Sequence, residues 1–434
     1  MRQAADKPGW KRRALYSGAL VLIAGAGVEL SSCVAYSLLF DESLSPAEVR
    51  ERQRDLARTG VENTATDRTG GTEEVIHPYL GFVSSPASEN ELVNELRGIG
   101  VSSFGFNDDK SPLQPAREDA LIVGIFGGSV AHYFSLQGIE ALERELQRVP
   151  RYRDRELVVV RTALAGWKQP QQFLALSYLL ALGAHFDLVL NLDGFNEVTL
   201  PFMENMKKGV YPPFPRNWFL RTQGMTDRRV RLAIGEAAHL REARAAWARR
   251  FAEAPWARGA TLSLVWRSRD RQLANGLQRV NQELLESRAE DAHYVAVGPP
   301  YAYGDAEKLA AEQVETWARS SLQMDRLARA NGIAYFHFLQ PNQYLPGAKP
   351  LHARERGLAW SDDSPYKPGV ERGYPLLRER GGELSVQGVR FFDLTGVFAD
   401  HEEPLYHDVC CHVNERGNEL LGQRIGEIVA AAEP

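Results

Sequence analysis

Short stretches of apolar residues recur along the chain, and segments with helical periodicity separate them. The clearest stretch runs from Leu121 to Phe126 without a charged side chain. A strand of this kind is buried on both faces, which happens when helices cover both sides of a parallel sheet. The other predicted strands are 157–160, 186–192, 333–339 and 389–394. We therefore predict an α/β fold, a three-layer α/β/α sandwich with a five-stranded parallel sheet in the order 2-1-3-4-5.

An apolar segment near the amino terminus is the second strong signal. Residues 14–40 contain one charged residue, Glu29, and exceed the ~20 residues that are needed to cross a bilayer core. Residues 1–13 carry five basic side chains and one acidic side chain, so the positive-inside bias places this tail in the cytoplasm. We predict a single-pass transmembrane anchor at 14–40, with the rest of the chain outside the cytoplasm.

Two other interpretations of this segment stay open. Leu30-Ser31-Ser32-Cys33 is similar to a bacterial lipoprotein cleavage box, but Glu29 and the apolar residues after Cys33 fit such a box poorly. A cleaved signal peptide has a shorter apolar region, of ~7–15 residues. Glu29 itself either contacts a partner or lies shallow in the membrane and reaches its surface.

The remainder of the chain divides by composition and charge. Residues 41–119 are predicted as a linker and lead-in segment, and 120–434 as one domain with a helical insertion at about 203–331. We expect the insertion to form a lid or side lobe partly over the carboxyl edge of the sheet. Without its basic tail the chain has a formal charge of −5 − 4 = −9, which argues against a nucleic-acid partner. Residues 216–290 are locally basic, with 15 Arg and 8 acidic residues, which indicates solvated helix faces or a surface for an anionic polymer or lipid headgroups.

Four short motifs lie where the strands of an open parallel sheet present their carboxyl ends. Gly127-Gly128-Ser129 follows the first strand, Gly166 the second and Asn196 the third, while His412 precedes the last helix. Each has a purely structural explanation, as a turn, a loop glycine or a helix cap. Each also fits catalysis, because a serine hydroxyl, backbone N–H groups, an amide and an imidazole are the groups that acyl transfer uses.

The order of these motifs resembles the SGNH (GDSL-type) hydrolase superfamily, which is named for Ser, Gly, Asn and His. The resemblance covers residues 120–200 and 333–429. It applies in particular to membrane-anchored bacterial members of unknown substrate, which share stretches such as Phe126–Ala131 and Leu192–Glu197. The family has a flavodoxin-like arrangement of strands and helices, so the resemblance implies that fold for this domain.

The resemblance also implies a role for each motif. Ser129 matches the nucleophile, although Gly127-Gly128-Ser129 stands where the family usually has Gly-Asp-Ser. His412 matches the base that takes the serine proton. The oxyanion-hole donors that it implies are the amides of Ser129 and Gly166 and the side chain of Asn196.

The acid of the triad departs from the family spacing. It commonly lies three residues before the histidine, where this chain has Val409, whereas Asp408 lies four residues before it. We take Asp408 as the candidate acid. Its displacement favours an alternative function, a catalytically degenerate SGNH domain that binds polysaccharide or takes part in its assembly, while the intact Ser129 and His412 favour an enzyme.

The implied function is that of a membrane-anchored serine esterase or acyl hydrolase in a bacterial periplasm or at the cell surface. Its substrate is expected to be an ester, such as an O-acylated carbohydrate, and the sequence leaves the oligomeric state open. We expect no cofactor and no metal. His407, Cys410, Cys411 and His412 are potential ligands, but they are crowded into six residues without a second cluster. A vicinal disulfide between the two cysteines is the other interpretation of this segment.

Two related classes of enzyme fit the sequence less well. A dinucleotide-binding site needs Gly-x-Gly-x-x-Gly, and the glycines around the end of the first strand stand at positions 124, 127 and 128 instead. An α/β-hydrolase has a second glycine two residues after its serine, where this chain has Ala131. Neither class explains Gly166, Asn196 and His412 together.

Overall fold

The computed structural model describes residues 10–59, 74–86, 99–254, 259–286 and 293–433. The chain forms two compact units. The first combines Met1–Ala65 with Asp227–Ser287, and we call it the anchor unit. The second combines Thr66–Thr226 with Arg288–Pro434, and we call it the sheet unit.

A five-stranded parallel sheet forms the centre of the sheet unit, in the order β4-β3-β5-β6-β7. Numbered along the chain from β3, this is the predicted order 2-1-3-4-5. The strands are β3 (Ala120–Gly127), β4 (Glu156–Arg161), β5 (Leu188–Asp193), β6 (Ala334–Leu339) and β7 (Phe391–Asp393). β3 and β5 are buried along their whole length, as expected for apolar strands inside a sheet. An antiparallel pair, β1 (Glu74–His77) and β2 (Gly81–Ser84), is separate from this sheet.

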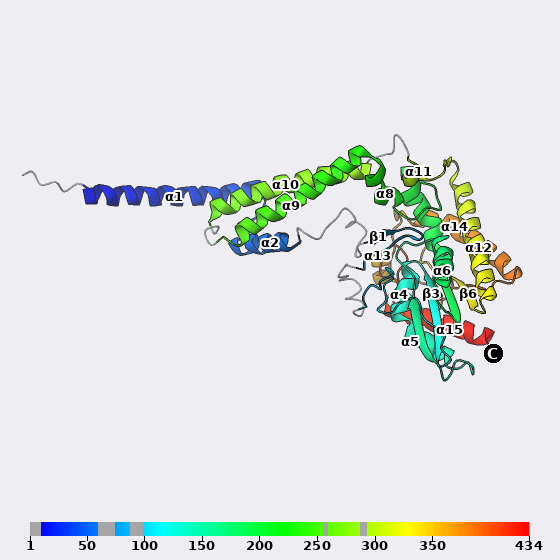
Figure 1. Ribbon diagram of the computed structural model, residues 1–434. Helices are drawn as coiled ribbons and strands as arrows, with labels where there is room; N and C mark the ends of the chain where they lie inside the picture. Colours follow the sequence, from blue (N-terminus) through cyan, green and yellow to red (C-terminus); the bar gives the residue numbers. More distant parts are fainter. Residues whose placement is uncertain (1–9, 60–73, 87–98, 255–258, 287–292, 434) are drawn as a thin grey trace, which may run out of the picture. The chain divides into compact units, whose positions relative to one another are not determined.

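Two groups of helices pack with the sheet. In the first, α4 contacts β3 and packs with α5 and α15, which run alongside each other in Figure 1. In the second, α12 contacts β6 and packs with α6 and α14. The bounds of the first group are α4 (Ser129–Gln137), α5 (Ile139–Leu146) and α15 (Glu415–Ala432). Those of the second are α6 (Gln171–Ala181), α12 (Ala306–Ala330) and α14 (Lys367–Val386).

Shorter helices complete the connections of the sheet unit. They are α7 (Phe195–Leu200), a π-helix η1 (Pro201–Asn205), a 3₁₀ helix η2 (Met206–Lys208), α8 (Trp218–Thr226), α11 (Tyr294–Val297) and α13 (Ala353–Ala359). α7 follows β5 directly, so it begins at the carboxyl edge of the sheet. The segment from η1 to α8 continues from that edge.

The anchor unit contains four long or amphipathic helices. They are α1 (Trp10–Phe40), α2 (Pro46–Thr59), α9 (Arg228–Ala252) and α10 (Ala260–Glu286). α9 and α10 pack against each other as a hairpin, α2 packs on α9, and α10 packs on the later part of α1 (Figure 1). A small core of Tyr36, Val49, Phe251 and Trp266 joins them. The segment predicted as a linker therefore begins with a helix that belongs to this core.

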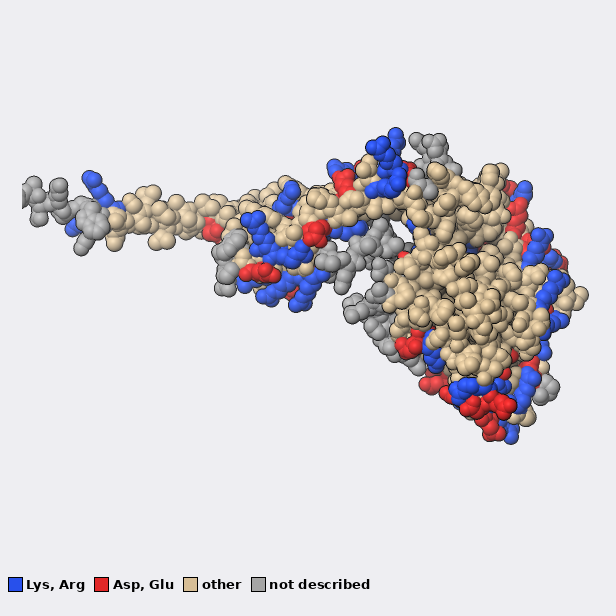
Figure 2. Space-filling model, in the orientation of Figure 1, with Lys and Arg blue, Asp and Glu red and all other residues tan. Residues whose placement is uncertain are grey.

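The first part of α1 is exposed, and its later part packs against α10. It is long and apolar enough to cross a membrane, and its side chains from residue 12 to residue 28 are all exposed within the anchor unit. Figure 2 shows this part as a tan surface between blue side chains at the start of the helix and the charged surface over α2 and α9. From Glu29 onward, α10 covers one face of α1.

Glu29 contacts the first turn of α10. Its carboxylate accepts the backbone N–H of Ala260 and, at 3.4 Å, that of Thr261. Ser32 Oγ lies 3.0 Å from Thr261 Oγ1 one turn later. A carboxylate at the start of a helix accepts hydrogen bonds from its free N–H groups and interacts favourably with the positive end of the helix dipole. Of the two interpretations of Glu29, the structure therefore shows a contact, and the partner is a helix of the same chain.

The helical insertion predicted at about 203–331 is divided between the two units. Residues 227–287 belong with α1 and α2, whereas the segments before and after them belong to the sheet unit. Phe251 of α9 and Trp266 of α10 explain the division, because both are buried in the core that also holds Tyr36 of α1. The part that stays with the sheet unit includes the segment from η1 to α8, which extends from its carboxyl edge.

Candidate active site

Ser129 begins α4 directly after β3, in a turn that requires two glycines. Gly127 has a φ of +145°, and a Cβ there would lie 2.1 Å from the Leu192 carbonyl oxygen. A Cβ at Gly128 would lie 2.3 Å from Asn196 Nδ2. A side chain at position 128 would therefore displace the Asn196 amide.

Ser129, His412 and Asp408 form a continuous chain of hydrogen bonds. His412 Nε2 lies 2.7 Å from Ser129 Oγ, and His412 Nδ1 bonds Asp408 Oδ2. Asp408 Oδ1 accepts the backbone N–H groups of Cys410, Cys411 and His412 at 2.9, 3.0 and 3.2 Å. Burial acts to raise the pKa of Asp408, but the His412 ring and these N–H groups outweigh it and lower that pKa to about 2. The aspartate is therefore a carboxylate at neutral pH.

The loop that carries Asp408 and His412 is held by three consecutive residues after β6. Gln343 Nε2 donates to the Asp408 carbonyl at 3.0 Å, Tyr344 Oη to that of Val409 at 2.9 Å, and Asn342 Nδ2 to that of Cys410 at 3.1 Å. Sequence analysis did not single out residues 342–344. Their only signal is a run of hydrogen-bonding side chains directly after a predicted strand.

Gly166 lies in the loop after β4, Asn196 lies at the start of α7, and the buried Glu197 joins these two segments. Glu197 accepts the backbone N–H of Gln169 at 2.8 Å and that of Gly194 at 3.0 Å. Burial, and then the nearby Asp193 carboxylate, raise the pKa of Glu197 to about 8. Asn196 Nδ2 donates to the Trp167 carbonyl at 2.7 Å, which uses one of the two N–H bonds of this amide.

All five predicted site residues line one cavity of about 260 Å³. The structure therefore brings Ser129, Gly166, Asn196, Asp408 and His412 together, as the sequence predicted. Its other lining residues are Glu74, Phe82, Ser84, Asn107, His132, Tyr133, Leu164, Ala165, Phe195, Leu200, Arg216, Tyr366 and Cys410. Sequence analysis missed Arg216, which comes from the predicted insertion and belongs to no motif.

A second serine–histidine–aspartate chain lies inside the sheet unit. His337 Nδ1 lies 2.7 Å from Ser321 Oγ, and His337 Nε2 lies 2.8 Å from Asp193 Oδ1. Trp317 Nε1 also donates to Asp193 Oδ1, at 2.6 Å. Ser321 and His337 are completely buried and Asp193 is 2% exposed, so no substrate reaches them. These hydrogen bonds satisfy buried polar groups in the core of the sheet unit. A substrate cannot reach them, so they have no catalytic role.

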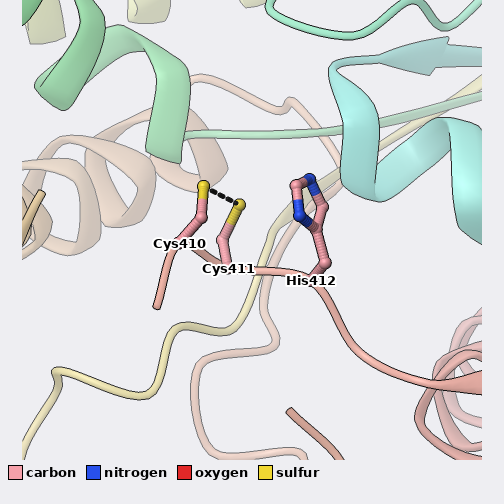
Figure 3. Close-up of side chains that lie close together, drawn as sticks. All are labelled: Cys410, Cys411 and His412. Atoms are coloured by element: carbon pink, nitrogen blue, oxygen red, sulfur yellow. Dashed lines mark hydrogen bonds between the residues drawn. The ribbon is translucent and has the colours of Figure 1, made fainter. Parts of the chain in front are cut away.

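Cys410, Cys411 and His412 are consecutive and lie close together (Figure 3). The two Sγ atoms are 3.1 Å apart, and both cysteines are free thiols here. Each residue offers one ligand atom, and these three atoms lie within 4.8 Å of one another. The residues fit a resident metal poorly, because His412 already uses one ring nitrogen for Asp408 and the other for Ser129. Burial raises the pKa of the Cys411 thiol, which further disfavours a thiolate ligand.

No family model and no curated protein matches the chain.

Proposed function

We propose that the chain is a membrane-anchored, extracytoplasmic serine esterase or acyl hydrolase of the SGNH type. The observation that carries the proposal is the hydrogen-bond chain from Ser129 through His412 to Asp408, at a cavity that Gly166 and Asn196 also line. A nucleophile, its base, the group that orients the base and two candidate oxyanion donors thus meet at one place.

The first half of the reaction would form an acyl-enzyme. His412 Nε2 takes the proton of Ser129 Oγ while that oxygen attacks the ester carbonyl carbon. Asp408 holds the ring in the tautomer with its proton on Nδ1 and stabilises the imidazolium that forms. His412 then gives the proton to the leaving alcohol, and Ser129 keeps the acyl group.

The negative charge of the tetrahedral intermediate needs donors that are already in place. The Ser129 and Gly166 backbone N–H groups and the second N–H of Asn196 Nδ2 supply them in this proposal. In the second half, water attacks the acyl-enzyme with His412 again as the base, and the acid product leaves.

The cavity favours a small acyl group. Its volume of about 260 Å³ is below the ~300–1,000 Å³ that is typical of pockets for drug-sized ligands. Phe82, Tyr133 and Tyr366 line it together with polar residues, a combination that suits a short ester on a sugar hydroxyl. An O-acylated carbohydrate outside the cytoplasm is therefore the substrate class that we propose.

Labelling with a fluorophosphonate probe tests the proposal without a known substrate. We expect the full chain in detergent to be labelled at Ser129, the Ser129→Ala variant to be unlabelled, and Ser177→Ala to be labelled like the wild type. Ser177 is a suitable control because its hydroxyl bonds a carbonyl of its own helix, away from the cavity. A folded wild-type chain without label would support the alternative, a degenerate domain that binds or assembles polysaccharide.

A further inference from the structure

Arg216 lies directly against Gly166 on the wall of the cavity. A Cβ at Gly166 would lie 1.9 Å from Arg216 Cδ, 2.7 Å from Nη1 and 2.8 Å from Nε. An ideal Cβ is about 2.5 Å from its own nitrogen, so Arg216 Nη1 lies no more than about 5 Å from the Gly166 nitrogen. The guanidinium therefore lies close to the residue whose backbone N–H we assign to the oxyanion hole.

Several contacts hold this arginine in place. Glu204 pairs with Arg216 Nη2 at 2.6 Å and accepts the Asn217 backbone N–H at 3.1 Å. Lys168, two residues after Gly166, donates from Nζ to the carbonyls of Pro212 at 2.7 Å and Phe214 at 2.6 Å. The segment that carries Arg216 is thus tied to the loop that carries Gly166.

The guanidinium is only partly used by the protein. Glu204 engages Nη2, while Nε is buried and has no hydrogen-bond partner in the described part of the chain. A charged group with donors to spare on the wall of a cavity stabilises an acceptor that enters there.

Arg216 could bind an anionic substrate or stabilise the oxyanion that forms during the reaction. The other charges around the cavity decide between these two roles. Glu74 and Asp408 also line the cavity, where they pair with Arg221 and His412, and Glu204 lies behind the arginine. The carboxylates of Glu74 and Asp408 on its wall make the cavity a poor site for an anionic substrate. Arg216 is therefore better suited to stabilise the single negative charge that forms on the oxyanion, beside Gly166, during the reaction.

We propose that Arg216 is a further catalytic residue, which donates a hydrogen bond to the oxyanion together with Gly166 and Asn196; this inference rests on the esterase function proposed above. The arginine keeps its proton throughout, because a guanidinium does not titrate in this pH range. It interacts more strongly with the oxyanion than with the neutral ester carbonyl, and such a difference raises the rate of the chemical step.

The rate of fluorophosphonate labelling measures this role, because the phosphonyl oxygen occupies the oxyanion position while Ser129 attacks. We expect Arg216→Gln to lower the second-order labelling rate about 10- to 100-fold, less than the 10²–10³-fold typical of a main oxyanion donor. Arg216→Lys keeps a charge without the guanidinium geometry, so its rate should lie between those of the wild type and Arg216→Gln. The matched control is Arg378→Gln, which removes an exposed ion pair with Asp393.

The outcomes separate this inference from the proposed function. Wild-type labelling rates in a folded Arg216→Gln variant would overturn the role of Arg216 and leave the esterase in place. If Arg216→Gln does not fold, Arg216→Lys decides, and a wild-type rate in that variant overturns the role. A wild-type chain without label at Ser129 would overturn both.

Discussion

The two oxygens of Asp408 have different partners. Oδ1 takes three consecutive backbone N–H groups, including that of His412, and Oδ2 bonds the His412 ring. This tight turn is what brings an aspartate four residues before the histidine to Nδ1. Spacing along the sequence could not decide whether Asp408 reaches the ring, because a residue count does not report how a turn folds. The displaced position therefore no longer favours a degenerate domain.

Asp408→Asn should impair the reaction much more than the fold. The Asn side chain can donate to His412 Nδ1, which favours the wrong tautomer and removes the charge that stabilises the imidazolium. We expect the rate of fluorophosphonate labelling to fall by about 10²–10⁴-fold. The matched control is Asp362→Asn on the surface, where a carboxylate pairs with Lys367. An unchanged rate in the Asp408 variant would remove this residue from the triad.

The lowered pKa of Asp408 also predicts a dependence of stability on pH. Since the folded-state pKa of about 2 is below the usual value of 3.8, the carboxylate stabilises the fold above about pH 4, and this contribution disappears as the pH falls through 2. The difference in thermal midpoint between wild type and Asp408→Asn should therefore be largest near neutral pH and shrink below pH 4. Scanning calorimetry from pH 2 to pH 7 measures it, and a difference that grows toward low pH would contradict the assignment.

At the scale of helices and strands, prediction succeeded where one kind of residue decides the structure. The strands from β3 to β6 follow from apolar runs that only a covered parallel sheet buries. β7 is shorter than predicted, because only Phe391–Asp393 pairs with β6. The helical spacing of apolar residues in α9 and α10 indicates that each helix has a face to bury, but not what covers that face. Part of these faces packs between the two helices, around Val230 and Val280, and another part packs with Tyr36 of α1, more than 190 positions before α9.

The contact of Glu29 with α10 predicts a local effect on that helix. Glu29→Leu leaves the first N–H groups of α10 without their acceptor, so hydrogen exchange at Ala260 and Thr261 should be about five- to tenfold faster, as for a lost helix cap. Glu29→Gln keeps an acceptor oxygen and should have a smaller effect. Leu30→Ala is the control, since Leu30 is 68% exposed within the anchor unit. Unchanged exchange in Glu29→Leu would show that the contact contributes nothing to α10.

At the scale of the whole molecule, the helix that could span a membrane and the candidate active site belong to different units. The apolar, exposed part of α1 belongs to the anchor unit. Every residue that we assign to the reaction belongs to the sheet unit. Each unit has a hydrophobic core of its own, which is the property of parts that fold independently. The insertion that sequence analysis assigned to the catalytic domain supplies Arg216 to the cavity and the hairpin of α9 and α10 to the anchor unit.

A chain without the anchor unit should therefore fold and keep the proposed esterase activity. Residues 1–65 can be deleted and 228–286 replaced by a short Gly/Ser linker, because Val230 of α9 and Leu284 of α10 lie in one cluster and the hairpin ends are close together. We expect this chain to be soluble without detergent and to label at Ser129 at close to the wild-type rate, since Ser129, His412, Asp408 and the oxyanion donors are all retained. The same chain with Ser129→Ala is the control. A soluble, folded chain that fails to label, beside a wild type that labels, would mean that the anchor unit contributes to the reaction itself.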